Sequence, residues 1–131
     1  MNEITSKTEV KLFVDAFYEK VRQDALLGPI FAAQIPDEVW PSHLTRMYGF
    51  WNTVLFGQKD YRGNPFSKHA NLAIHPPHFE RWLSLFVATI DESFTGEKAA
   101  ETKMRAAKMA ALFQSKLDYV RSKKNPSFHI L

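Results

Sequence analysis

The sequence predicts an all-α fold of about five helices, in a single domain that spans residues 1–131. Apolar residues recur in steps of three and four over most of the chain, which is the period of a helix. No Asn-Gly or Asp-Gly turn separates two alternating apolar runs, so the usual signal for a β-hairpin is missing. A chain of this length is typical of one domain and can bury a core without disulfide bonds.

The first helix is predicted from a cap and one apolar stripe. Ser6 with Glu9 three residues later has the spacing of a capping box. Gly28 and Pro29 are expected to end or redirect this helix, and residues 30–35 form a short apolar piece. The stripe repeats at helical spacing and consists of Val10, Phe13, Val14, Phe17, Tyr18 and Val21.

A second long helix is predicted over residues 37–56, with Asp37 as its N-cap. The following residues, 57–68, have the Gly, Asn and Pro content of a loop, and residues 69–74 have room for one helical turn. The apolar stripe of this second helix also includes one histidine, and it consists of Trp40, His43, Leu44, Met47, Phe50, Trp51, Val54 and Leu55.

Two further helices are predicted in the C-terminal half. Pro76 and Pro77 open the first of them, because proline is tolerated in a first turn. The other covers residues 97–122, and residues 122–131 form a tail without a pattern. The buried stripe of the first consists of Phe79, Trp82, Leu83, Phe86, Val87 and Ile90. The expected contacts of the second are Met104, Ala107, Met109, Leu112, Phe113, Leu117 and Val120.

The composition excludes several classes of protein. Cysteine is absent, so there is no disulfide scaffold, zinc finger, iron–sulfur cluster or cysteine nucleophile. Aromatic residues make up 14% of the chain, whereas the net charge of +3 decides little about partners. There is no apolar run of about 18 residues and no signal-peptide pattern. We therefore expect a cytoplasmic protein that does not associate with membranes.

Four residues are candidates for chemistry, each with a simpler alternative. His69 follows the loop and could ligate a metal through one ring nitrogen, or lie at the surface. His43 interrupts an apolar stripe, so it either faces a cavity or bonds a backbone carbonyl in the core. Tyr18 and Trp82 could each donate a hydrogen bond into a pocket, or simply pack in the core.

The remaining polar motifs are weaker. His75 and His78 are three residues apart, but no third zinc ligand accompanies them. The glycine-rich motifs of nucleotide-binding proteins and the G-x-S-x-G motif are absent. The basic run near the C-terminus suits a solvated helix end, so no nucleic-acid partner is expected. This run consists of Lys116, Arg121, Lys123 and Lys124.

Several of these motifs, taken in order from Val10 to Leu117, together resemble the truncated haemoglobins. The group III branch is the best match, since His43 and Trp82 are both present. The Gly-Gly motifs that groups I and II typically carry are absent. The motifs are Phe17-Tyr18-Glu19-Lys20-Val21-Arg22, Leu27-Gly28-Pro29-Ile30-Phe31, His43 with Phe50-Trp51, the segment 61–69, and Phe79-x-x-Trp82-Leu83.

The resemblance implies a two-over-two helical sandwich around one haem b, with a haem-binding core over about residues 8–121. It makes His69 the proximal iron ligand and assigns Tyr18, His43 and Trp82 to the distal side. Arg46 and Lys68 are candidates for binding the haem propionates. The expected haem-pocket residues are Phe31, Met47, Phe50, Lys68, His69 and Phe79.

The resemblance further implies binding of O2, and of NO and CO, by a monomer or weak homodimer. Two donors, Tyr18 and Trp82, would slow the release of O2, which favours gas capture or chemistry over bulk oxygen transport. That chemistry would be NO dioxygenase-like or peroxidase-like and would need an external reductase. His43 could gate entry, bond the ligand or ligate the iron. The alternatives are a non-catalytic O2 buffer or gas sensor, and a cofactor-free helical module that binds proteins or nucleic acid.

Overall fold

The computed structural model describes residues 2–59, 61 and 74–123. These residues form five α-helices and one short 3-10 helix, and the extended pairing within them is one isolated bridge between Asn2 and Phe94. The all-α prediction is confirmed. None of the helices in this part of the chain is long and apolar enough to cross a membrane. In chain order the elements are α1 (Lys7–Gln23), α2 (Gly28–Gln34), η1 (Asp37–Val39), α3 (Trp40–Phe56), α5 (Pro76–Ser93) and α6 (Glu97–Lys123).

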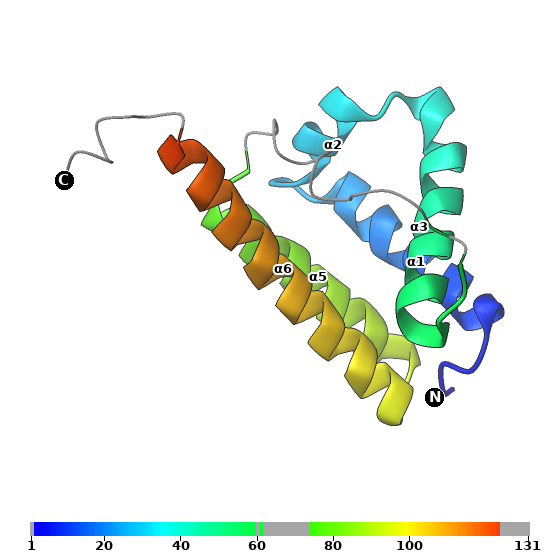
Figure 1. Cartoon of the computed structure of the whole chain (residues 1–131). Coiled ribbons are helices and arrows are strands. Elements are labelled where there is room, and N and C mark those ends of the chain that lie inside the picture. The colour runs from blue at the N-terminus through cyan, green and yellow to red at the C-terminus, as the bar shows by residue number, and fades with distance from the viewer. Residues whose placement is uncertain (1, 60, 62–73, 124–131) are drawn as a thin grey trace.

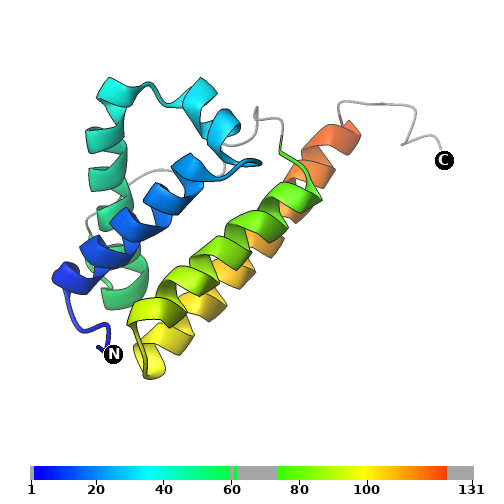
Figure 2. The ribbon, with the colours of Figure 1, turned by 180° about the vertical axis from the view of Figure 1, so that it is seen from behind.

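The helices form two antiparallel pairs. α1 runs beside α3 in the opposite direction, and α5 and α6 form the second pair (Figure 1). The view from behind shows the same two pairs, with α1 next to α5 (Figure 2). Because α1 packs on both α3 and α5, it joins the two pairs. This is the two-over-two arrangement that the resemblance implied.

α1 begins where the sequence predicts, with a modified cap. The Ser6 hydroxyl accepts a hydrogen bond from the Thr8 N–H at 3.3 Å, so Ser6 is the N-cap. The Glu9 carboxylate accepts from the Thr5 N–H at 2.9 Å and from the Ser6 hydroxyl at 3.1 Å. In a capping box it would accept from the backbone N–H of the cap residue. The helix start is therefore as predicted, but the carboxylate reaches one residue further back.

The role predicted for Gly28 and Pro29 is wrong. α1 ends at Gln23, and Gly28 and Pro29 begin α2. Proline suits the first turn of a helix because the N–H groups of that turn have no intrahelical partner, so a residue without an N–H loses no hydrogen bond there. A Cβ atom on Gly28 would lie 2.9 Å from the Arg22 carbonyl oxygen, so glycine lets α2 start directly against the end of α1.

Asp24 fixes the corner between α1 and α2. Its buried carboxylate accepts hydrogen bonds from the N–H groups of Leu26 and Leu27 at 3.1 and 3.0 Å, and from Arg81 Nε of α5 at 2.7 Å. Burial would raise the pKa of Asp24, but the bonds from Leu27, Arg81 and Leu26 together lower it below its usual value. The corner is thus tied to α5, which sets the position of α2.

The helix predicted over residues 37–56 is divided in two. Residues Asp37–Val39 form η1, and α3 begins at Trp40. Asp37 does not cap a helix, because its carboxylate instead accepts a hydrogen bond from Arg22 Nη2 at 2.9 Å. α3 ends at Phe56 and is capped by Gly57, whose φ of +67° lies in the left-handed region that favours glycine.

The buried face of α6 differs from the prediction. Met104 and Leu112 were expected to make contacts, but they are 42% and 51% exposed, and Ala107 is exposed as well. Apolar residues occur on several sides of this helix, so their spacing does not select one face. The buried face of α6 consists mostly of small side chains, which allow the helix to pack closely on α5. The buried residues are Ala99, Thr102, Ala106, Ala110 and Leu117.

Phe86 lies at the centre of the core. It is 1% exposed and stacks on Trp51 of α3 at 5.0 Å and on Trp82 of its own helix at 5.5 Å, between ring centroids. The rings of Phe13 and Phe17 in α1 meet it edge-on at 5.9 and 5.1 Å. One ring therefore connects α1, α3 and α5.

Candidate functional site

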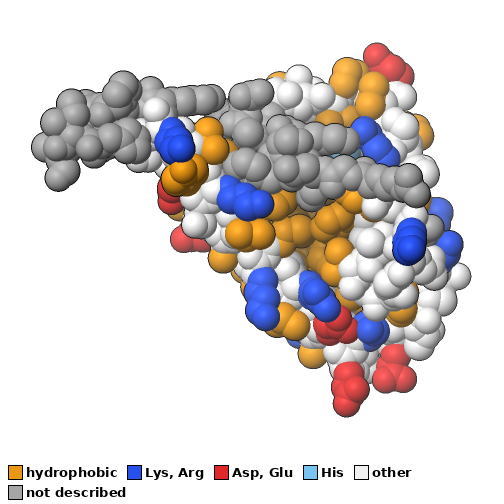
Figure 3. All heavy atoms as spheres, in the orientation of Figure 1, with side chains coloured by type: hydrophobic (Ala, Val, Ile, Leu, Met, Phe, Trp, Pro, Cys, Tyr) orange, Lys and Arg blue, Asp and Glu red, His pale blue; other side chains and the backbone are white. Residues whose placement is uncertain are grey.

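A cavity of about 290 Å³ lies between the two helix pairs. Figure 3 shows apolar side chains gathered in a hollow on this face of the molecule. A mostly apolar wall with a few polar groups is typical of a pocket for a small molecule or cofactor. The lining residues come from α1, α2 and the residues that flank it, α3, α5 and α6, and from Tyr61 and Ile74. They are Tyr18, Leu27, Ile30, Phe31, Gln34, Ile35, His43, Arg46, Met47, Phe50, Trp51, Tyr61, Ile74, His78, Phe79, Trp82, Met109, Ala110 and Phe113.

Most of the residues predicted for the site line this one cavity. Lys68 and His69 lie outside the described residues, so their roles stay predictions. Most of the loop and turn predicted over residues 57–74 also lies outside the described part of the chain. The predicted residues found at the cavity are Tyr18, Phe31, His43, Arg46, Met47, Phe50, Phe79 and Trp82.

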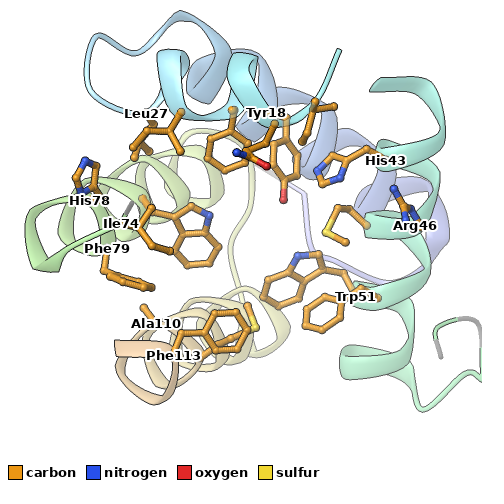
Figure 4. Close-up of a pocket in the computed structure, with 18 of the residues that line it drawn as sticks. Tyr18, Leu27, His43, Arg46, Trp51, Ile74, His78, Phe79, Ala110 and Phe113 are labelled. Carbon is orange, nitrogen blue, oxygen red and sulfur yellow. The ribbon is translucent and has the colours of Figure 1, made fainter. Parts of the chain in front are cut away.

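Tyr18 presents a hydroxyl group to the cavity. Its side chain is 8% exposed, and the hydroxyl points into the pocket (Figure 4). Among the described residues this hydroxyl has no hydrogen-bond partner. Burial raises the pKa of Tyr18 far above its ordinary value, so the phenol stays protonated and can donate. Phe17 holds the Tyr18 ring edge-on, with 4.9 Å between the ring centroids.

His43 lies next to Tyr18 on the cavity wall. Its ring meets the Tyr18 ring edge-on at 5.1 Å and the Trp40 ring at 5.2 Å, between centroids. Arg46, almost one turn further along α3, lies at the edge of the pocket (Figure 4). It is exposed and forms no ion pair with another residue that the structure describes. The rim of the cavity thus carries a positive charge that can meet an anionic group.

Trp82 approaches from α5. It is half-buried, its ring lies nearly parallel to Phe86 at an angle of 13°, and it meets Phe17 edge-on at 5.4 Å. These contacts fix the indole at the cavity wall. The structure thus brings three predicted polar residues, Tyr18, His43 and Trp82, to one cavity from three different helices.

Sequence reasoning did not assign Trp51 or the α6 residues to the site. Trp51 was predicted as part of a buried stripe and of a motif of the resemblance, and neither says where its indole N–H points. Met109 and Phe113 were predicted as contacts of their helix, and their spacing of four was the available signal. Ala110, between them, carries no signal for a pocket because alanine is common in any buried helix face.

His75 and His78 form a helix cap. The His75 N–H donates a hydrogen bond to His78 Nδ1 at 2.9 Å, at the start of α5. Arg121 of α6 donates to the Ile74 carbonyl oxygen at 2.7 Å and so ties the two helices together beside this cap. In the described part of the chain, no three His, Asp or Glu side chains gather as a metal-binding group would.

Comparisons with known proteins match nearly the whole chain. The family model described as bacterial-like globin matches residues 2–115. The group 3 truncated hemoglobin ctb of Campylobacter jejuni is 36% identical over 118 residues, which is 88% of this chain and 93% of the relative. The group 1 truncated hemoglobin GlbN of a Nostoc species is 29% identical over 80 residues, covering 60% of this chain and 64% of the relative.

A solved structure gives the same result. The crystal structure of the group III truncated hemoglobin from Campylobacter jejuni matches with a TM-score of 0.82 and 36% identity, over 89% of this chain and 95% of that one. The predicted resemblance to the group III truncated haemoglobins is confirmed by these matches. Since the family model and the more similar relative both cover most of the sequence, the chain belongs to the bacterial-like globin family.

Proposed function

We propose that the cavity binds one haem b and that the protein binds O2, and also NO and CO, on the side of Tyr18. The observation that carries this proposal is the Tyr18 hydroxyl, a protonated donor in a mostly apolar cavity, which bonds no other described residue. A donor in that position suits a polar guest. The names of the similar proteins, all truncated hemoglobins, support the same interpretation.

The residues of the cavity fit a haem. Its walls offer aromatic and aliphatic side chains to a large apolar ring, as Phe31 of α2 and Phe79 of α5 do from two sides. The sequence has no cysteine, so the group would be held without thioether bonds, as haem b is. We propose that His69 would ligate the haem iron and that Arg46 and Lys68 would bind the propionates. A bound haem supplies an iron with an open position for a diatomic gas.

The polar groups around the cavity suit a ligand that gains negative charge on binding, as O2 does. Tyr18 and Trp82 are donors, and a hydrogen bond to a charged group contributes roughly 1.5–3 kcal/mol. We propose that they slow the release of O2, which favours capture or conversion of the gas. Conversion of NO or peroxide would use electrons from an external reductase. We propose that His43, whose ring contacts the Tyr18 ring, gates entry, bonds the ligand or ligates the iron.

We also propose that residues 1–131 form one globin domain with a haem-binding core over about residues 8–121. The family match begins at residue 2 and ends at residue 115. The cavity-lining residues run from Tyr18 in α1 to Phe113 in α6, so the pocket draws on nearly the same span.

Titration with haemin tests the proposed function. We expect the purified protein to take up one haemin per chain and to develop a strong Soret band. The His69→Ala variant should lose the spectrum of a histidine-ligated ferrous haem. His75→Ala is the matched control, because His75 is exposed and does not line the cavity. A chain that stays colourless with added haemin would contradict the proposal, and an unchanged ferrous spectrum of His69→Ala would exclude His69 as the ligand.

A further inference from the structure

Trp51 is a cavity residue that the sequence did not reveal. It lies on α3, one turn after Met47, and lines the cavity with its side chain 4% exposed. Figure 4 shows its indole nitrogen directed into the pocket, toward the hydroxyl group of Tyr18. The two donors therefore face the same space from α3 and α1.

Ring contacts fix the orientation of this indole. Phe86 stacks on it at 5.0 Å with an angle of 23° between the ring planes. Phe13 and Phe50 meet it edge-on at 5.8 and 5.4 Å. Because Phe13 and Phe86 are each 1% exposed, the indole cannot turn without disturbing the core. The direction of its N–H is thus set by the fold.

The Trp51 N–H has no hydrogen-bond partner among the residues that the structure describes. Buried indole N–H groups usually find a partner, because leaving one unbonded costs free energy. The buried hydroxyls of two threonines away from the cavity follow that rule. The hydroxyls of Thr89 and Thr102 donate to the carbonyl oxygens of Leu85 and Lys98, each at 2.7 Å. The Trp51 N–H, like the Tyr18 hydroxyl, instead faces the cavity, which indicates that its partner is a guest there.

We propose that Trp51 donates a hydrogen bond to the gas ligand and thereby favours O2 over CO. This inference rests on the proposed function. An indole N–H can donate but cannot accept. It therefore stabilises a ligand that carries negative charge, as bound O2 does. It stabilises CO less, because bound CO carries less negative charge. Trp51 acts on the ligand from α3, while Tyr18 acts on it from α1.

The variant Trp51→Phe tests this role, because it removes the N–H and keeps an aromatic ring for Phe86 to stack on. In the haem-loaded protein we expect the dissociation rate of O2 to rise about tenfold or more. The dissociation rate of CO should change by less than about twofold. Trp40→Phe is the matched control. Trp40 is buried and packs on the Tyr18 ring, but it does not line the cavity.

A second measurement uses the unmodified protein. The chain has three tryptophans, so isotope labelling gives three indole N–H signals in a nuclear magnetic resonance spectrum, assigned with the single Trp→Phe variants. The Trp51 proton should exchange with water more slowly in the O2 complex than in the CO complex. Equal exchange in both complexes, or an unchanged O2 dissociation rate in Trp51→Phe, would overturn the inference and leave the proposed function intact. A protein that takes up no haemin would overturn both.

Discussion

Replacing Tyr18 with phenylalanine is expected to speed the dissociation of O2 by about 10- to 150-fold. The change removes one hydroxyl and keeps the ring, which is held by edge contacts with Phe17 and His43 at 4.9 and 5.1 Å. The buried phenol stays protonated because burial raises the pKa of Tyr18. The donor is thus present at neutral pH. Stopped-flow displacement of O2 by CO measures the rate.

Tyr48→Phe is the matched control for this experiment. Tyr48 is a second tyrosine of the same helix pair, but its hydroxyl donates to Asp15 and it does not line the cavity. Burial and the bond to the Asp15 carboxylate raise the pKa of Tyr48 to about 12, so it too remains a neutral donor. Its loss should leave O2 dissociation within about twofold of the parent rate. If Tyr18→Phe behaves in the same way, Tyr18 does not bond the ligand.

Replacing Phe86 with alanine is expected to lower the free energy of unfolding by about 3–5 kcal/mol. The ring is 1% exposed and contacts rings from α1 and α3, so its removal leaves a void that the neighbouring helices cannot fill. The stacking surface for Trp51 and Trp82 is lost at the same time. Urea unfolding followed by circular dichroism gives the stability of the haem-free protein.

Leu112→Ala provides the control for the Phe86 variant. Leu112 is 51% exposed on α6, so its truncation should change the free energy of unfolding by no more than about 0.5 kcal/mol. A loss of less than about 1 kcal/mol for Phe86→Ala would show that the aromatic cluster does not hold α1, α3 and α5 together.

The elements with one clear apolar stripe could be predicted from the sequence. α1 has a single stripe and a cap at Ser6, and both were found as expected. The predicted start of α3 was wrong. Aspartate favours N-cap positions because of local hydrogen bonds, whereas the carboxylate of Asp37 binds Arg22 in another helix. For α6 the spacing could not select a face, and the close approach to α5 favours alanines over Met104 and Leu112.

The residues of the candidate site could also be predicted only in part. Tyr18, His43 and Trp82 stood out because polar or amphipathic groups on an apolar stripe need a partner. Trp51 did not stand out in the sequence, because its proposed role depends on the direction of one N–H. Rings from α1 and α5 fix that direction. Contacts between helices far apart in the sequence are not visible in local spacing.

If haem binds in the cavity between the two helix pairs, filling that cavity with a larger side chain should weaken haem binding. Ala110 of α6 is 5% exposed and lines the cavity, whereas its neighbour Ala111 is exposed and does not. The measurement is haemin affinity by absorbance titration for Ala110→Trp, Ala111→Trp and the parent protein, with helical content checked by circular dichroism. We predict that Ala110→Trp folds but binds haemin at least about tenfold more weakly, which corresponds to about 1.4 kcal/mol, while Ala111→Trp matches the parent. Equal haemin affinity in a folded Ala110→Trp would show that haem does not bind between the two helix pairs.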